Sequence, residues 1–273
     1  MIYTLEQTLV KIEDVTLVLN GNTILKPINY EIKNIVRPDL TQGQITGFLG
    51  PSGIGKTMLF EILSGLRKPT TGRVLLNING ELIETKPGLV GVVQQSYPLF
   101  EHRTVWDNLV IAAKRFNTKK DAIDKVRVIL KRFELDGKEH LYPRSLSGGQ
   151  RQRVAIAQQI LCSLNYLLMD EPFSGLDPMM VKKTLHLIAE IASSDELMTI
   201  IMVSHILDAM ASISDELIGI GRDKDEKNNN IPGAYFKWKY DLKAIDLAWN
   251  PKIKENPRFT NLLLEIEKAF ELL

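Results

Sequence analysis

The sequence contains a single cysteine, Cys162, in 273 residues. One thiol excludes an internal disulfide and a zinc site built from several cysteines, and it fits a reducing compartment. Cys162 lies in an apolar stretch predicted to be helical, so we expect a buried structural side chain. A strong excess of charge is also missing: 34 basic residues stand against 33 acidic ones. The composition therefore gives no sign of the basic surface that nucleic-acid-binding proteins usually carry.

Long hydrophobic runs are absent as well. No apolar segment of the sequence approaches the ~20 residues that a bilayer-spanning helix needs. Residues 1–14 include acidic side chains and lack the apolar region of a secretory signal. We therefore expect this protein to serve any membrane process from the cytoplasm, through partners. Its content of 44% hydrophobic and 25% charged residues is that of a globular protein with a large core.

The first part of the chain has the pattern of β-structure. Residues 9–32 predict short strands, with a hairpin turn at Asn20-Gly21-Asn22. Residues 33–43 predict a loop insertion, and the apolar segment Ile45 to Leu49 predicts a compact strand. The sequence therefore begins with an antiparallel β subdomain.

Strands then alternate with helices. Buried strands are expected at 166–169 and 199–203, with a helix between them at about 179–193. Such alternation favours an α/β fold with a largely parallel sheet covered on both faces. The helical pattern over about 96–160 predicts an inserted helical subdomain.

Residues 50–57 read Gly-Pro-Ser-Gly-Ile-Gly-Lys-Thr and match the phosphate-binding loop pattern, with a strand before and a helix after. Glycines let successive backbone N–H groups face a phosphate, and the start of the helix adds a favourable dipole. Lys56 offers a cation to the β- and γ-phosphates, and the Thr57 hydroxyl is a ligand for Mg²⁺. We expect a nucleotide site here.

Two acids, Asp170 and Glu171, follow the buried strand at 166–169. Beside a phosphate loop, Asp170 is expected in the Mg²⁺ shell, and Glu171 can polarise the attacking water. Without that loop, two acids after a strand would be weak evidence, since they could simply cap a helix.

The segment Leu146-Ser147-Gly148-Gly149-Gln150 lies between these two motifs and decides the family. It resembles the signature of ATP-binding-cassette (ABC) proteins, and the order of phosphate loop, signature and acidic strand covers about residues 10–220. The resemblance implies a P-loop NTPase core with an antiparallel β subdomain and an inserted helical subdomain. It also implies an ABC domain over 8–221, followed by a C-terminal extension of unknown role over 222–273.

Smaller motifs of the family are also present. Gln95 matches the glutamine that links the nucleotide site to the helical subdomain, with the adjacent Gln94 as the alternative. Asp177 matches a loop that contacts the opposite subunit, and His205 matches the switch histidine, which contacts the γ-phosphate. The resemblance thus implies catalytic roles for Glu171 and His205, and Mg²⁺ ligation by Thr57, Gln95 and Asp170. The implied ATP contacts are Gly50, Pro51, Ser52, Gly53, Ile54, Gly55, Lys56, Thr57, Gln95, Ser147, Gly148, Gly149, Gln150 and Asp177.

The sequence departs from the family in three places, one of which, Ala157-Gln158-Gln159 where relatives often carry an arginine, is expected to have little effect on the chemistry. Leu19 occupies the position at which relatives carry an aromatic residue that stacks on adenine, so the base is expected on an aliphatic surface. Glu101 stands where a proline is common, in the region that faces the membrane subunit in relatives. In the extension, Phe259, Leu262, Leu263, Ile266 and Phe270 fall on one helical face, which favours packing on the same domain, with docking to a partner as the alternative.

By resemblance, each ATP site pairs the phosphate loop of one chain with the signature of another. The implied partners are a second cassette chain, identical or not, transmembrane permease subunits and a solute-binding protein, at the inner face of the cell membrane. ATP closes the dimer, and hydrolysis reopens it to drive solute movement. The flanks of the signature favour an importer over an exporter. The alternatives are a chromosome-maintenance or repair ATPase, a translation-associated cassette protein and a regulatory ATPase bound to a membrane complex.

Overall fold

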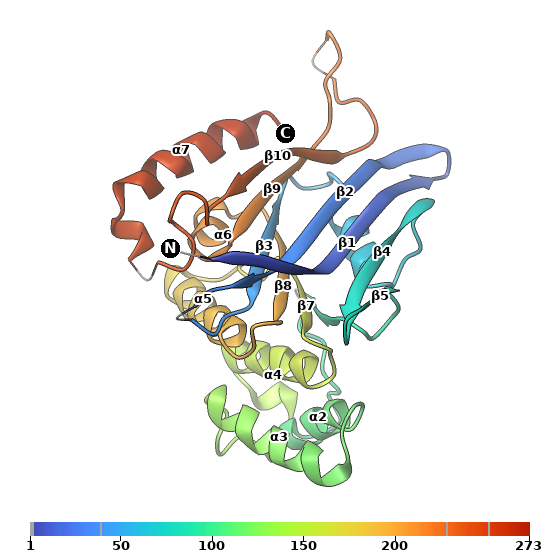
Figure 1. Cartoon of the computed structure of the whole chain (residues 1–273). Helices are drawn as coiled ribbons and strands as arrows, with labels where there is room; N and C mark the ends of the chain where they lie inside the picture. Colours follow the sequence, from blue (N-terminus) through green and yellow to red (C-terminus); the bar gives the residue numbers. More distant parts are fainter. Residues whose placement is uncertain (1–2, 39, 95, 228, 251) are drawn as a thin grey trace.

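The computed structural model describes residues 3–38, 40–94, 96–227, 229–250 and 252–273. Two β-sheets lie side by side, and a group of helices extends away from them at one end (Figure 1). The first sheet is antiparallel, with the strand order β2-β1-β4-β5. Its strands are β1 (Thr4–Leu19), β2 (Asn22–Val36), β4 (Thr71–Ile78) and β5 (Glu81–Glu84).

The β1–β2 hairpin confirms the predicted turn, because Leu19 pairs with Asn22 and leaves Asn20 and Gly21 between them. Both turn residues have positive φ, 51° and 78°, as a two-residue turn of the type favoured in hairpins requires. The strands themselves are long rather than short, with 16 and 15 residues.

The predicted loop insertion at 33–43 is wrong at its start. Residues 33–36 continue β2, where Ile35 pairs with Leu5. The prediction rested on Arg37-Pro38-Asp39 and placed the start of the loop too early, since Asn34 is only 3% exposed and belongs to the strand. The connection to the next strand is accordingly shorter than the sequence suggested.

The second sheet has the order β10-β9-β3-β8-β7-β6 and is parallel from β9 to β6. Only its edge strand β10 runs antiparallel, beside β9. The carboxyl ends of the parallel strands therefore meet along one edge, where the predicted site residues follow β3, β7 and β8. The strands are β3 (Gln44–Leu49), β6 (Gly91–Val93), β7 (Tyr166–Asp170), β8 (Thr199–Ser204), β9 (Glu216–Gly221) and β10 (Tyr235–Asp241).

Helices cover both faces of this second sheet. Helix α1 packs with the antiparallel sheet on one face, and α5 and α6 pack on the other. Helices α2, α3 and α4 form the group at the far end of the molecule (Figure 1). The helices are α1 (Lys56–Leu63), α2 (Val105–Ala113), α3 (Lys119–Arg132), α4 (Gly148–Leu161), α5 (Pro178–Ala192), α6 (Leu207–Ile213) and α7 (Pro257–Glu271), with short 3₁₀ helices at Pro143–Ser145 and Ile253–Glu255.

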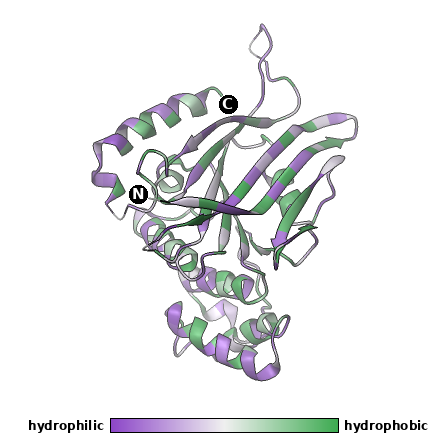
Figure 2. Cartoon of the chain, viewed as in Figure 1, coloured by the Kyte–Doolittle hydropathy of each residue, from purple (hydrophilic) through white to green (hydrophobic). Residues whose placement is uncertain are grey.

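The C-terminal extension packs on the chain's own core. Strand β10 completes the parallel sheet at its edge, and Phe259, Leu262 and Ile266 of α7 are buried in the cluster that also contains helix α6. The apolar side of α7 faces this core and the polar side faces outward (Figure 2). No helix of the described residues combines the length and hydrophobicity that crossing a bilayer requires.

Candidate functional site

The phosphate loop joins β3 to α1 at the carboxyl edge of the parallel sheet. Gly53 and Gly55 have φ values of 77° and 114°, which only glycine adopts without strain. The buried Lys56 side chain turns back into this loop, and its amine donates to the carbonyl oxygens of Gly50, at 2.7 Å, and Pro51, at 3.1 Å. The Lys56 amine therefore lies inside the loop, next to the backbone that would surround a bound phosphate.

Glu171 connects this loop with the end of the neighbouring strand β8. One carboxylate oxygen lies 3.8 Å from the amine of Lys56. The other accepts a hydrogen bond from Ser204 Oγ at 3.0 Å and lies 2.9 Å from His205 Nδ1. Glu171 has a φ of 49°, a conformation that costs a non-glycine residue about 1–3 kcal/mol and that is common at functional sites.

Asp170 and Thr57 line one cavity of about 470 Å³, together with Gln94 and Ser96. A carboxylate and a hydroxyl, completed by water and phosphate oxygens, form the oxygen ligand set that Mg²⁺ prefers. These two residues therefore fit the predicted metal site. Gln94, the alternative to Gln95, faces this cavity; Gln95 itself lies outside the described residues.

Burial dominates the electrostatics of this cluster. Burial and the adjacent charge of Glu171 raise the pKa of Asp170, against the opposite effect of Lys56. Burial likewise lowers the pKa of Lys56, although Glu171 and Asp170 oppose the shift. Burial therefore disfavours the charged forms of both Asp170 and Lys56, and neighbours of opposite charge reduce this effect.

The predicted signature residues form the N-terminus of α4. Ser147 is the N-cap: its hydroxyl accepts from the Gln150 backbone at 3.3 Å, and Gln150 Oε1 accepts from the Ser147 backbone at 3.0 Å. Ser147 and Gly148 are exposed. The capping box satisfies the backbone N–H groups of Ser147 and Gln150, and the exposure of Ser147 and Gly148 lets a second molecule approach the start of the helix.

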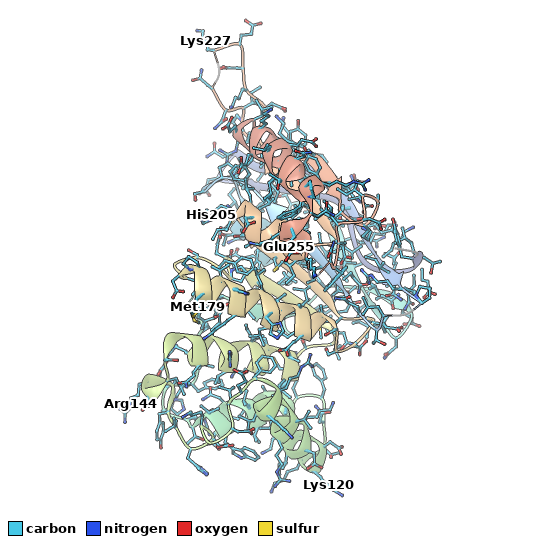
Figure 3. The ribbon with its side chains drawn as sticks, turned by 90° about the vertical axis from the view of Figure 1, so that its left-hand side faces the viewer. Lys120, Arg144, Met179, His205, Lys227 and Glu255 are labelled. Atoms are coloured by element: carbon cyan, nitrogen blue, oxygen red, sulfur yellow. The ribbon has the colours of Figure 1, made fainter. Side chains whose placement is uncertain are left out.

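The loop containing Asp177 lies beside the signature. Asp177 caps α5 by accepting from the backbones of Met179 and Met180, at 2.9 and 3.0 Å. A Cβ atom on Gly149 would lie 2.6 Å from Met180 Cε, so the signature packs closely on the first turn of α5. His205, Met179 and Arg144, which precedes the signature, follow one another down one side of the molecule (Figure 3).

The chain thus presents its predicted site residues as two groups. Lys56, Thr57, Asp170, Glu171 and His205 meet at the carboxyl edge of the parallel sheet. The signature and the Asp177 loop form a second, exposed group beside it.

Sequence reasoning missed two residues of the first group. Ser204 donates to Glu171, and Arg222 Nη2 donates to the carbonyl oxygen of Gly53 at 3.3 Å. Ser204 could have been found, because it ends the strand before His205. Arg222 could not, because its proximity depends on β9 lying beside β3.

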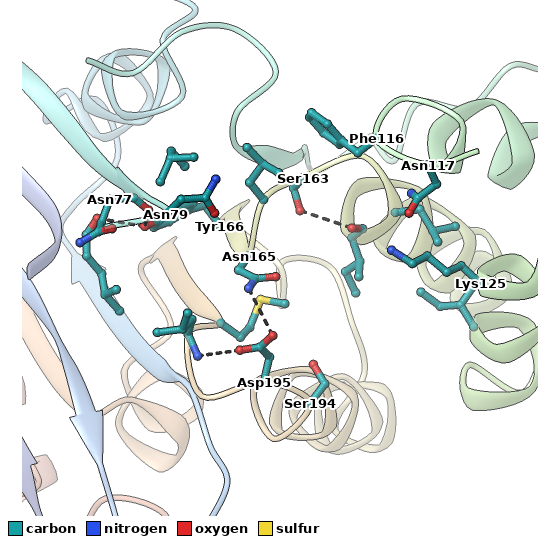
Figure 4. A pocket seen from close by; sticks show the side chains of 18 of the residues that line it. Asn77, Asn79, Phe116, Asn117, Lys125, Ser163, Asn165, Tyr166, Ser194 and Asp195 are labelled. Atoms are coloured by element: carbon teal, nitrogen blue, oxygen red, sulfur yellow. Dashed lines mark hydrogen bonds between the residues drawn. The ribbon is translucent and has the colours of Figure 1, made fainter. Parts of the chain in front are cut away.

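A further cavity, of about 810 Å³, lies at the opposite edge of the sheet (Figure 4). Asn165 and Met198, which precede β7 and β8, belong to its lining, as do Asn79 and Lys125. Asn165 donates to Asp195 at 3.2 Å, so part of its polar lining is already paired. This cavity is separate from the candidate nucleotide site, whose residues lie at the carboxyl ends of the same strands.

Comparison with known proteins identifies the family. The family model described as "ABC transporter" matches residues 34–174. The chain belongs to the ABC transporter family. The predicted family and fold class are thereby confirmed.

Relatives of this ABC chain include proteins of several transport systems. It is 33% identical over 216 residues to the spermidine/putrescine import ATP-binding protein PotA of Mycoplasma capricolum subsp. capricolum, covering 78% of this chain and 59% of PotA. It is 32% identical over 222 residues to the L-cystine transport system ATP-binding protein TcyN of Escherichia coli, covering 77% and 85%. Both names include ATP binding.

Among solved structures, cbiO1 from Clostridium perfringens, described as part of the ABC transporter complex cbiONQ, has a TM-score of 0.72. The two share 25% sequence identity, and the match covers 96% of this chain and 100% of cbiO1. The similarity extends to nearly the whole chain, beyond the 34–174 of the family model.

Proposed function

We propose that this chain is the ATP-hydrolysing subunit of an ABC transporter that imports a solute. The observation that carries the proposal is the position of Glu171, which lies between the phosphate-loop Lys56 and His205. The relatives named for polyamine import and for cystine transport support a transport role. They differ in solute, and the solute pocket would lie in other chains.

Each residue of the proposed site has a separate role in the hydrolysis of ATP. The phosphate loop and Lys56 bind the phosphates and neutralise their charge. Glu171 orients a water and accepts its proton as the water oxygen bonds to the γ-phosphorus. The bond from that phosphorus to the bridging oxygen breaks, leaving ADP and phosphate. His205 and Ser204 hold the Glu171 carboxylate in place, since both contact the same oxygen.

Mg²⁺, held by Thr57 and Asp170, would supply charge neutralisation at the phosphates. We propose that Gln94 or Gln95 completes this side of the site. The exposed signature residues Ser147 and Gly148 are free to contact ATP on a second cassette chain. Transmembrane permease subunits and a solute-binding protein complete the proposed assembly. In this assembly the chain lies at the cytoplasmic face of the membrane. It has no proposed role in binding nucleic acid.

Replacement of Lys56 by Ala tests the nucleotide site. We expect loss of ATP binding or hydrolysis with an unchanged fold, measured by nucleotide titration, phosphate release and circular dichroism. The matched control is Lys120→Ala, an exposed lysine at the far end of the helical group (Figure 3). Normal turnover by folded Lys56→Ala protein would refute the assignment.

The transport role needs its own experiment. Copurification of a polytopic membrane protein, followed by an ATPase assay with and without solute, distinguishes a transporter subunit from a regulatory or repair ATPase. Stimulation of hydrolysis by a solute is expected. Hydrolysis that responds to DNA or ribosomes instead would favour the other classes.

A further inference from the structure

The signature helix α4 carries a buried glutamine that no step of the proposed reaction uses. Gln152 is 3% exposed, and it lies in the second turn of α4, two residues after Gln150. Burying an amide without partners costs several kcal/mol, so such a group persists in a core only when hydrogen-bonded.

Both ends of the Gln152 amide have partners from other segments. Its nitrogen donates to the Tyr97 hydroxyl at 2.9 Å and to the Pro172 carbonyl at 3.3 Å. Its oxygen accepts from the Thr184 hydroxyl at 3.3 Å. The Tyr97 hydroxyl in turn donates to the same Pro172 carbonyl at 3.5 Å, which closes the network.

Each partner belongs to a segment that also carries a site residue. Pro172 directly follows Glu171, and Tyr97 lies in the segment just after Gln94 and Gln95. Thr184 belongs to α5, the helix capped by Asp177, and Gln152 belongs to α4, the helix capped by Ser147. One buried amide therefore joins four segments that converge on the proposed chemistry.

We propose that Gln152 is a positioning residue that fixes the turn after Glu171 relative to the signature helix. The proposal rests on the function proposed above. Glu171 serves the phosphate loop of its own chain, whereas Ser147 would contact ATP on a second chain. Gln152 joins the two within one chain, so that a displacement of α4 at one ATP site is transmitted to the carboxylate at the other.

The position of Glu171 makes this link effective. Its backbone has a left-handed φ of 49°, which a non-glycine residue keeps only when its surroundings enforce it. Hydrogen bonds to the Pro172 carbonyl restrain the turn on one side. The Glu171 amide, which donates to the Val203 carbonyl at 2.8 Å, restrains it on the other. Loss of the first restraint should misplace the carboxylate, and small misplacements of catalytic groups can cost about 10²-fold in rate.

Gln152→Met tests the proposal, because it keeps the volume of the side chain and removes its hydrogen bonds. We expect kcat for ATP hydrolysis to fall about 10–100-fold, while the Kd for ATP changes less than about twofold, because the phosphate contacts lie elsewhere. The matched control is Gln159→Met in the same helix, where Gln159 Oε1 accepts from the Val92 backbone at 3.0 Å. That control is expected to lower the melting temperature but leave kcat within about twofold.

A second pair of variants keeps the test valid if Gln152→Met does not fold. Thr184→Val removes the hydroxyl that donates to Gln152, whereas Thr184→Ser keeps it. We expect a lower kcat for Thr184→Val and near-normal kcat for Thr184→Ser. Tyr97→Phe should lower kcat in the wild-type background and have little further effect in Gln152→Met.

Normal kcat in folded Gln152→Met protein, or equal kcat in the two Thr184 variants, would overturn the positioning role. A parallel loss of kcat and ATP affinity would also overturn it, because it would indicate general disruption. The Lys56→Ala variant separates the two hypotheses. If it hydrolyses ATP normally, the proposed function itself is wrong; if it is inactive while Gln152→Met is normal, only this inference is wrong.

Discussion

Glu171 is the residue at which the parts of the proposed nucleotide site meet. Its carboxylate lies between Lys56 on one side and Ser204 and His205 on the other, and its backbone adopts a left-handed conformation. The proposed general base must reach its water from a fixed direction, and contacts to two other segments, at Lys56 and at Ser204 with His205, restrain the Glu171 carboxylate. The role of this side chain therefore depends on residues well beyond its own motif.

Leu19 offers a test at the base-binding end of the site. It is half-buried at the end of β1, against the apolar cluster that includes Phe48. We expect Leu19→Tyr to tighten ATP binding, because stacking on a base contributes about 1–3 kcal/mol in nucleic-acid complexes. Isothermal titration with ATP would measure the gain. Val18→Tyr is the control, since its side chain is exposed on the opposite face of the strand; equal effects would show that Leu19 does not face the base.

Arg222 supports the phosphate loop from a distant part of the sequence. Its guanidinium donates to the carbonyl oxygen of Gly53 and so supports the left-handed turn of the phosphate loop. Loss of one hydrogen bond costs about 1 kcal/mol, so Arg222→Ala should raise the Kd for ATP about fivefold. Lys227→Ala, at the tip of the adjacent loop and away from the core (Figure 3), should leave it unchanged. An unaltered Kd in Arg222→Ala would remove Arg222 from the site.

At the scale of elements, β9 ties the C-terminal extension to the rest of the fold. Asp215, just before β9, is fully buried and pairs with Arg37 at 2.5 Å, while its other oxygen accepts from the Ile45 backbone at 2.7 Å. Trp249 of the extension donates to the same carboxylate at a short distance. The buried Asp215 carboxylate therefore joins three parts of the chain: the connection after β2, strand β3 and the C-terminal extension.

Arg37→Ala should accordingly be severe. Removing one partner of a buried ion pair typically costs about 3–5 kcal/mol, because it leaves the other charge uncompensated. Arg127→Ala is the control, since its pair with Asp124 is exposed and should contribute less than about 0.5 kcal/mol. Urea unfolding of the two variants measures both free energies. Similar small losses would mean that the Asp215 carboxylate is adequately held without Arg37.

The neighbouring Glu216, which pairs with lysines of the extension, makes the stability of the fold depend on pH. Burial raises the pKa of Glu216, but Lys243, Lys239 and Tyr30 outweigh it, so that the pKa lies below its ordinary value of 4.5. A lowered carboxyl pKa contributes stability that is present above pH 4.5 and lost as pH falls through the folded-state pKa. Glu216→Gln should thus be less stable than wild type at pH 7, and the difference should shrink below pH 4.5. Urea unfolding at both pH values tests this; a constant difference would contradict it.

The sequence predicted the motif-bearing loops well because their information is local. The hairpin turn at Asn20-Gly21 and the strand–loop–helix around Lys56 follow from a few adjacent residues. The pairing of Arg37 with Asp215 joins residues 178 positions apart, and no local pattern encodes it. The same holds for Arg222, whose place beside Gly53 depends on strand order. The loop signal of Arg37-Pro38-Asp39 did not show where β2 ends, because Asn34, although polar, is buried within that strand.

In the proposed dimer, each whole chain would contribute half of two ATP sites. The phosphate loop gathers Lys56, Asp170 and Glu171, whereas Ser147 and Gly148 are exposed at the start of α4. If ATP joins Ser147 of one chain to the phosphate loop of another, slow hydrolysis should preserve the dimer. Measuring the ATP-dependent dimer therefore also tests the proposed role of Glu171 in hydrolysis.

Glu171→Gln should therefore accumulate as an ATP-dependent dimer. The amide keeps the shape of the carboxylate but removes the basicity, and loss of a general base typically lowers the rate ~10²–10⁴-fold. Binding should survive because the phosphate contacts lie elsewhere.

Adding Ser147→Arg should disrupt the dimer by placing bulk and charge at the interface. Thr118→Arg, at the exposed N-cap of α3, is the matched control and should leave the dimer intact. Light scattering with and without Mg-ATP measures each step. Normal hydrolysis by Glu171→Gln would contradict its role as the base, whereas an inactive, ATP-bound monomer would show that dimerisation needs a membrane subunit or a different cassette chain.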